Sequence, residues 1–181
     1  GGQSVTNQLP YSLLWRSIET GILPVCRQAG MSVLCYSPLQ QGLLSGKYPN
    51  PEALTEGRRR TRIFRPDSAA KSRHGSPGLE EEVFGDDGAL VKLKSACEAA
   101  GISMVDGATG WLLSQPGISC VLIGASTPAQ VKRNAKLPTL DAATIAALSA
   151  ATEPLKQALA AQGNWVDQYA KRSRIHGNEA R

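Results

Sequence analysis

The chain has 181 residues, of which 41% are hydrophobic and 19% charged, enough apolar material for the core of one globular domain. Its net charge of +5 suits an anionic ligand such as a dinucleotide but is too small to indicate a nucleic-acid partner. No apolar run approaches the roughly 20 residues that a membrane-spanning helix needs, so we expect no membrane partner.

The first part of the chain reads as a strand, a helix and a second strand. Residues 4–8 are β-prone and stop before Pro10, which places Gln8 at the carboxyl end of the first strand. Residues 13–28 then form a helix that Pro24 should break or kink, and residues 31–36 form the second strand. This spacing predicts two parallel strands joined by a right-handed crossover, and hence an α/β fold.

Residues 37–88 form a long loop region without clear periodicity, interrupted by prolines 38, 49, 51, 66 and 77. A basic cluster occupies residues 58–65, and one of its arginines could reach a bound phosphate. The alternative use of this cluster, gripping nucleic acid, is disfavoured because only Phe64 is available for base stacking. We expect residues 68–88 to be mobile.

The rest of the chain predicts four further helices and one further strand. Helices are expected over residues 89–100 and 103–114, and a third strand lies within residues 117–124. The helix-capping sequence Thr127-Pro128-Ala129-Gln130 follows that strand. Residues 140–161 form an Ala-rich helix capped by Asp141 and kinked near Pro154, before a basic polar tail.

The four cysteines are widely spaced in apolar surroundings, with no C-x-x-C pair. This pattern predicts buried, reduced thiols of an intracellular protein rather than disulfides or a structural zinc site. No targeting segment is visible in the first residues, so the sequence leaves the compartment open.

Two stretches have the residues of a nucleotide site. Tyr36 and Ser37 end a strand and lead into a glycine-punctuated loop that closes with Lys47, so a ring could stack there and phosphates could be held. After the third strand, Ser126 and Thr127 could hold a phosphate, with an adenine against residues further along the helix. An ordinary capped helix with polar residues facing solvent explains the second stretch equally well.

Several of these motifs, in order and spacing, resemble the aldo-keto reductase family, with the plant, algal and potassium-channel β-subunit members looking most similar. The resembling runs are Asn7-Gln8 with Tyr11-Ser12-Leu13-Leu14, Tyr36 to Tyr48, Trp111-Leu112-Leu113, and Gly124 to Pro128 with Gln130 and Asn134. The resemblance implies a (β/α)₈ TIM barrel, of which this chain would hold about strands six to eight, and NADP(H)-dependent reduction of aldehydes and ketones. It implies a partial domain over residues 1–162 with a long loop at 37–88, followed by the tail at 163–181. A chloroplast would fit the plant-like resemblance, and the cytoplasm stays the other expected compartment.

The resemblance also implies roles for individual residues in binding NADP(H). Gln8 would bond the nicotinamide amide and Tyr36 would stack on its ring. The loop from Ser37 through Pro38, Leu39, Gln40 and Gln41 would line the pyrophosphate, and Lys47 and Arg60 would reach phosphate. Gly124, Ser126 and Gln130 would lie on the 2′-phosphate side and Asn134 against the adenine. Arg133 replaces a common acidic residue of the family, which weakens one adenine contact but favours the 2′-phosphate.

The family's catalytic Asp, Tyr, Lys and His have no matching positions in this chain. We therefore expect a fragment that carries the cofactor-binding half, with open sheet edges that favour self-association. Two functions stay open: part of a reductase whose carbonyl substrate is met by the other half, or a non-catalytic NADP-binding regulatory module. For the isolated chain we expect no carbonyl reduction.

Overall fold

The computed structural model describes residues 5–55, 63, 78–136 and 139–161. The predictions for Arg60, for most of the basic cluster and for the tail at 163–181 lie outside these residues. Three parallel strands form one sheet in the order β1 (Thr6–Pro10), β2 (Ser32–Tyr36) and β3 (Ile118–Leu122), as the spacing predicts. Within the described ranges, every helix is too short or too polar to cross a membrane.

The first strand lies two residues further along the chain than predicted, because it runs through Pro10 rather than stopping before it. Pro10 pairs with Tyr36, and Gln8 pairs with Leu34 in the middle of the strand rather than at its end. Proline is tolerated here because β1 is an edge strand with β2 on one side only.

The single helix expected over residues 13–28 is wrong. The chain makes a tight turn closed by a bridge between Ser12 and Trp15, then the 3₁₀ helix η1 (Ser17–Thr20), and then α1 (Ile22–Gln28). Pro24 does not break α1, because it lies in the first turn, where a backbone N–H has no intrahelical partner. The interruption between η1 and α1 lies at Gly21 instead. Residues 11–16 are all buried, which one face of a helix could not achieve.

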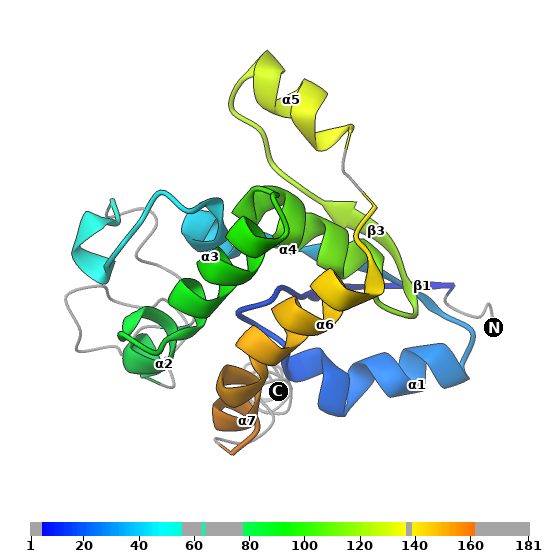
Figure 1. Ribbon diagram of the computed structural model, residues 1–181. Helices are drawn as coiled ribbons and strands as arrows, with labels where there is room; N and C mark the ends of the chain where they lie inside the picture. The colour runs from blue at the N-terminus through cyan, green and yellow to red at the C-terminus, as the bar shows by residue number, and fades with distance from the viewer. Residues whose placement is uncertain (1–4, 56–62, 64–77, 137–138, 162–181) are drawn as a thin grey trace, which may run out of the picture.

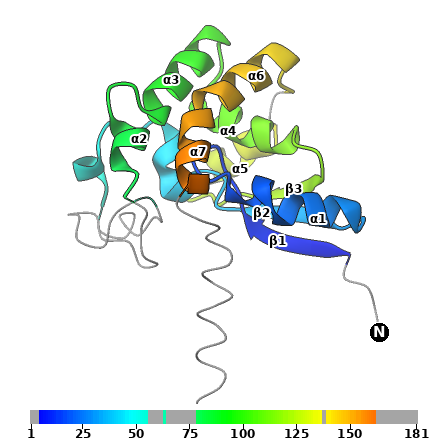
Figure 2. The same ribbon diagram turned by 90° about the horizontal axis from the view of Figure 1, so that it is seen from below.

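The later helices agree with the predictions. α3 (Ala89–Ala99) and α4 (Met104–Leu113) are joined at Gly101, and the Ser103 hydroxyl accepts a hydrogen bond from the Asp106 N–H at 3.1 Å. α6 (Ala142–Ala151) starts at the Asp141 cap and is separated from α7 (Glu153–Ala161) by Thr152, next to Pro154. Figure 2 shows α3 and α6 side by side, and they are in contact.

Gly107 lowers the intrinsic stability of α4 but permits close packing. A Cβ atom at Gly107 would lie 2.8 Å from the sulfur of Cys97 on α3. α3 and α4 can therefore pack closely at this point only because residue 107 has no side chain.

Part of the long region after β2 is more ordered than expected. It contains the 3₁₀ segments η2 (Gln40–Ser45) and η3 (Pro51–Ala53) and the helix α2 (Glu80–Phe84), which packs against α3 and α7. Leu79 and Val83 are fully buried, so the predicted mobility is wrong for residues 78–88. Two apolar side chains one turn apart hold this short helix against the core.

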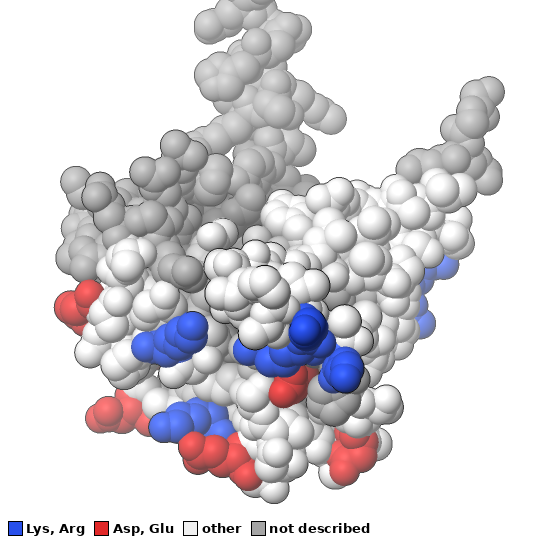
Figure 3. All heavy atoms as spheres, turned by 90° about the horizontal axis from the view of Figure 1, so that it is seen from above, with Lys and Arg blue, Asp and Glu red and all other residues white. Residues whose placement is uncertain are grey.

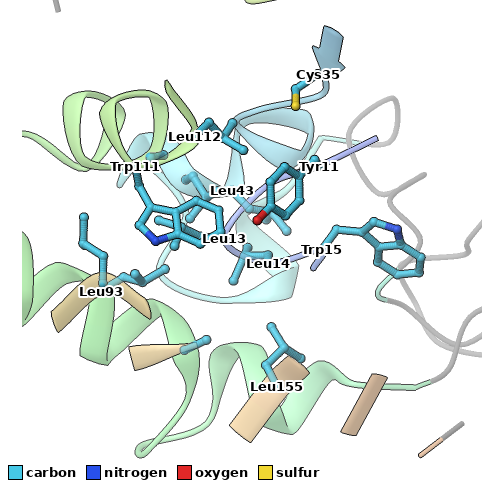
Figure 4. Close-up of a cluster of buried hydrophobic side chains, with 14 of the residues drawn as sticks. Tyr11, Leu13, Leu14, Trp15, Cys35, Leu43, Leu93, Trp111, Leu112 and Leu155 are labelled. Atoms are coloured by element: carbon cyan, nitrogen blue, oxygen red, sulfur yellow. The ribbon is translucent and has the colours of Figure 1, made fainter. Parts of the chain in front are cut away.

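The two faces of the sheet differ. Leu9, Val33 and Cys35 point into the buried core beneath the helices, where Tyr11, Leu43 and Trp111 belong to the same cluster (Figure 4). The alternate positions, which include Gln8, Tyr36 and Leu122, lie on the opposite face, and Gln8 and Leu122 are exposed. Within the described residues the helices lie on the other side of the strands, and this second face has no covering layer (Figure 2).

Candidate functional site

The loop after β2 carries unusual backbone geometry. Ser37, Gln40 and Gln41 have φ angles of 57°, 44° and 59°, and they are the non-glycine residues with positive φ in the described chain. Each such residue costs of order 1 kcal/mol or more, and this strain tends to gather at binding sites. Three strained residues within five positions directly after a strand therefore indicate a binding site at this loop.

Buried contacts hold this loop in its strained form. Leu43 and Leu44 are buried in the core, and the Leu44 N–H donates to the Leu39 carbonyl at 3.2 Å. The Gln40 N–H donates to the Ser37 carbonyl at 3.0 Å, and the Ser45 hydroxyl donates to the Gly42 carbonyl at 2.6 Å. The loop geometry is thus fixed by the protein before any ligand binds.

Two hollows that share Leu39, Gly42 and Gly124 lie along this loop, and we call them together the groove. The hollow at the end of the sheet has a volume of about 320 Å³. Its lining consists of Ser37, Pro38, Leu39, Gln41, Gly42, Leu122, Ile123 and Gly124. The hollow toward α5 (Pro128–Asn134) has a volume of about 160 Å³. Its lining adds Ser45, Lys47, Tyr48, Val105, Ser126, Gln130 and Arg133.

Most of the predicted site residues that the structure describes line this groove. They are Ser37, Pro38, Leu39, Gln41, Lys47, Gly124, Ser126 and Gln130. The structure therefore brings together the two stretches singled out in the sequence, which are about 80 residues apart in the chain.

Four predicted residues do not line the groove. Gln8 and Tyr36 lie on the open face of the sheet, in neighbouring strands and two register positions apart. Asn134 lies at the far end of α5, where its side-chain oxygen accepts from the Arg133 guanidinium at 3.1 Å. The Gln40 side chain is buried beneath the loop, with 6% of the residue exposed.

The capping signature at α5 is confirmed. The Thr127 hydroxyl accepts from the Gln130 N–H at 3.3 Å, and the Gln130 side-chain oxygen accepts from the Ser126 N–H at 2.6 Å. In a capping box the Gln130 side chain would accept from the N–H of the cap residue Thr127, but here it accepts from the N–H of Ser126 instead. α5 has seven residues, none of them buried, and it projects from the rest of the described chain (Figure 1).

The charge of the groove is positive. Lys47 and Arg133 line it, and neither hollow has an aspartate or glutamate in its lining. In the view from above Figure 1, Lys and Arg side chains lie near the middle of the face with Asp and Glu side chains beside them (Figure 3), so the positive charge is a property of the groove lining and not of the whole face. A groove with this lining suits an anionic ligand.

A buried polar cluster behind the loop was not found from the sequence. It consists of the buried Tyr11 and Arg16, the half-buried Glu19 and Lys156, and Glu153 at its more exposed edge. Arg16 donates to both carboxylate oxygens of Glu19, at 2.7 and 3.0 Å. It also donates to the carbonyl of Ser149 in α6, at 2.9 Å. The spacing Arg16 to Glu19 within an apolar stretch was the available signal, because isolated charges in such a stretch need a partner.

Hydrogen bonding sets the protonation of this cluster. Burial alone would raise the pKa of Glu19, but hydrogen bonds from Arg16, Lys156 and Tyr11 hold the pKa of the carboxyl below its usual value. Burial, together with the charge of Glu19, raises the pKa of Tyr11 far above its usual value. Tyr11 is therefore a neutral hydrogen-bond donor at physiological pH, and it donates to Glu19 at 2.8 Å.

The cysteines are free thiols, as predicted, and Cys26, Cys35 and Cys97 are buried. Burial, with the nearby Cys120, raises the pKa of Cys35 to about 12, so this thiol is not activated. Among the described residues, no group of three or more His, Cys, Asp or Glu side chains could hold a metal ion.

Comparison with known proteins gives matches over most of the chain. Residues 3–153 match the aldo/keto reductase family. The NADH-specific methylglyoxal reductase of Escherichia coli (strain K12) is 31% identical over 127 residues, which cover 70% of this chain and 35% of the relative. The aldo-keto reductase yakc [NADP(+)] of Schizosaccharomyces pombe is 29% identical over 107 residues, which cover 59% of this chain and 28% of the relative.

A solved structure has the same partial fold. The glycerol dehydrogenase of Gluconobacter oxydans superposes with a TM-score of 0.57 at 26% identity, covering 81% of this chain and 41% of that chain. This chain thus spans about a third of the length of the curated relatives it matches. With three parallel strands in a partial TIM-barrel fold and a match over residues 3–153, the chain belongs to the aldo/keto reductase family.

Proposed function

We propose that this chain is the cofactor-binding part of an NADP(H)-dependent oxidoreductase that reduces aldehydes and ketones. In this proposal its strands correspond to strands six to eight of the barrel. The observation that carries the proposal is the groove, in which a strained loop at the end of a central parallel strand faces two cations and no carboxylate. Ligands of α/β folds bind at this end of the strands.

In this proposal the parts of a dinucleotide bind in order along the open face of the sheet, the groove and α5. The nicotinamide would bind over the open face near Gln8 and Tyr36, and the pyrophosphate along residues 37–42. The adenosine end would then bind toward α5, with Asn134 against the adenine. Arg60, which lies outside the described residues, stays a predicted phosphate contact.

The preference for NADP(H) over NADH rests on the cations at the α5 end. Arg133 and Lys47 line the same hollow as Ser126 and Gln130, so a 2′-phosphate there would meet two positive charges. The relatives differ in this respect, because one is named NADH-specific and another NADP(+)-dependent. The proposal therefore gives Arg133 a role in selectivity that a family match alone does not supply.

The chain's contribution to the reaction is binding and orientation. When bound, NADPH supplies the hydride that reduces a carbonyl carbon. No residue of this chain matches the family's catalytic Asp, Tyr, Lys or His, so we propose that the carbonyl substrate and its proton donor belong to a part of the barrel other than these strands.

The proposal is tested by titrating NADPH into the purified chain and following the nicotinamide fluorescence. We expect saturable binding that is lost in Tyr36→Ala and retained in Tyr36→Phe, because phenylalanine keeps the ring on which the nicotinamide would stack. Absence of saturable binding by the wild-type chain would reject the proposal. Oxidation of NADPH on adding an aldehyde would reject its non-catalytic part.

A second function, a regulatory or interaction module, is favoured by the edges of the sheet. β1 and β3 each pair with another strand on one side only within the described residues, and such edge strands are where strand addition occurs. Sedimentation velocity over a range of concentrations tests this. Oligomers that dissociate on dilution would support self-association, and a monomer at every concentration would contradict it.

A further inference from the structure

The starting observation is a buried glutamine inside the strained loop. Gln40 has a φ angle of 44°, and 6% of it is exposed, although its neighbour Gln41 is exposed and lines the groove. A long amide side chain loses substantial rotamer entropy and hydration on burial. Its inward orientation at a strained position therefore needs a compensating contact.

That contact is Ser12, which belongs to a different part of the chain. The Ser12 hydroxyl donates to the side-chain oxygen of Gln40 at 3.4 Å, and Ser12 is fully buried. Both groups are removed from water, so each would leave a buried polar atom without its partner if the other were lost.

Ser12 is itself held rigidly. Its N–H donates to the Trp15 carbonyl at 3.2 Å, and the Trp15 N–H donates back to Ser12 at 2.9 Å. The Tyr11 N–H donates to the Tyr36 carbonyl at 3.3 Å. The turn at residues 11–15 thus contacts the groove loop at two places, the end of β2 and the middle of the strained segment.

Hydrogen bonds also connect residues 11–15 to the junction of α6 and α7. The Tyr11 hydroxyl donates to Glu19, which is held by Arg16, and Arg16 donates to the Thr152 hydroxyl at 3.1 Å between α6 and α7. The core around Tyr11, Leu13, Leu14 and Leu43 is continuous (Figure 4). A fixed support of this kind can hold a strained loop in a single conformation.

We infer that Ser12 and Gln40 are positioning residues for the cofactor loop: their buried hydrogen bond holds residues 37–42 in the strained form that binds the pyrophosphate. This rests on the proposed binding of NADP(H) in the groove. It assigns Gln40 a role different from direct cofactor contact, because its side chain points away from the groove and into the core.

The test compares two ligands on four variants. Ser12→Ala and Gln40→Met each remove one partner, the double variant removes both, and Gln115→Met removes a remote glutamine whose amide donates to the Trp111 carbonyl at 3.0 Å. NADPH spans the whole groove, whereas 2′,5′-ADP carries only the adenosine end. Dissociation constants are measured for both ligands, together with urea unfolding of each variant.

We expect Ser12→Ala and Gln40→Met each to weaken NADPH binding about fivefold, the usual size of one lost buried hydrogen bond. Binding of 2′,5′-ADP should change by less than about twofold, because α5 does not depend on this contact. The double variant should bind NADPH no more weakly than the worse single variant, because the two residues act through one bond. Gln115→Met should leave both affinities unchanged.

The outcomes separate the inference from the proposal on which it rests. Equal weakening of NADPH and 2′,5′-ADP would indicate general destabilisation and overturn the inference, as would unchanged NADPH binding in the single variants. If the wild-type chain binds 2′,5′-ADP but not NADPH, the loop has no part in binding and the inference fails while the adenosine site stands. If it binds neither ligand, the proposed function fails and the inference with it.

A measurement without ligand gives a second check. In Gln40→Met we expect faster amide hydrogen exchange at Gly42 and Leu44, whose N–H groups close the loop onto Leu39. Exchange at the strand amides of β2 should stay slow. Unchanged exchange at Gly42 and Leu44 would overturn the inference independently of any binding result.

Discussion

The two ends of the groove are built in opposite ways. At the sheet end, the loop after β2 is strained, and its residues Leu43 and Leu44 are buried in the core. At the α5 end, the helix has no buried residue, and Val131 is 58% exposed. One end is therefore fixed by the fold, whereas the polar groups at the other end are held mainly by local capping bonds.

This difference indicates a division of work along one ligand. A preformed site binds without a cost of ordering, so the sheet end suits the pyrophosphate and nicotinamide, which must be placed accurately. An exposed helix with charged side chains suits recognition of a peripheral group such as a 2′-phosphate. Changes at the sheet end should thus affect both stability and binding, and changes at the α5 end should affect binding alone.

The largest expected effect comes from the buried polar cluster that supports the sheet end. Arg16→Met should lower the free energy of unfolding by about 3 to 5 kcal/mol, because it removes the two charge-assisted hydrogen bonds to Glu19 together with those to Ser149 and Thr152. Urea unfolding followed by circular dichroism measures this. The control is Lys94→Met, whose pair with Glu98 spans 3.9 Å on the surface and should contribute less than about 1 kcal/mol. Equal losses in both variants would contradict the structural role of the cluster.

A matched pair of apolar truncations compares the two ends directly. Leu43→Ala, at a fully buried position, should lower the free energy of unfolding by about 2 to 5 kcal/mol and weaken NADPH binding. Val131→Ala, on the exposed side of α5, should change stability by less than about 0.5 kcal/mol. A larger loss for Val131→Ala would mean that α5 packs against a partner in solution.

The smallest effect on stability, and the most selective on binding, is expected at Arg133. Arg133→Ala should weaken NADPH binding about tenfold, in line with the loss of one charge-assisted hydrogen bond, and leave NADH binding and urea unfolding unchanged. The control is Lys136→Ala, an exposed cation just beyond α5 that does not line the groove. Equal weakening of NADPH and NADH would show that Arg133 does not read the 2′-phosphate.

Much of the architecture could be predicted from local sequence because local physics decides it. The apolar run before Tyr36, the caps at Ser103, Thr127 and Asp141, and the break near Pro154 all appear in the structure as expected. Errors arose where tertiary contacts outweigh local preference. The turn at residues 12–15 replaces a helix because its neighbouring side chains are all buried, and α2 is ordered because Leu79 and Val83 reach the core.

The sequence by itself determined the parallel α/β order, the two stretches that meet in the groove, and the family, since these depend on periodicity, turn residues and motif spacing. Only the tertiary structure decided which of two adjacent glutamines faces the groove, because Gln40 turns inward to Ser12 across 28 positions of the chain. It alone also brought Lys156 against Arg16 and Glu19, a pair that lies three positions apart in the sequence but about 140 positions from Lys156. Buried polar groups must find partners wherever the fold brings them, and no local pattern records which ones they meet.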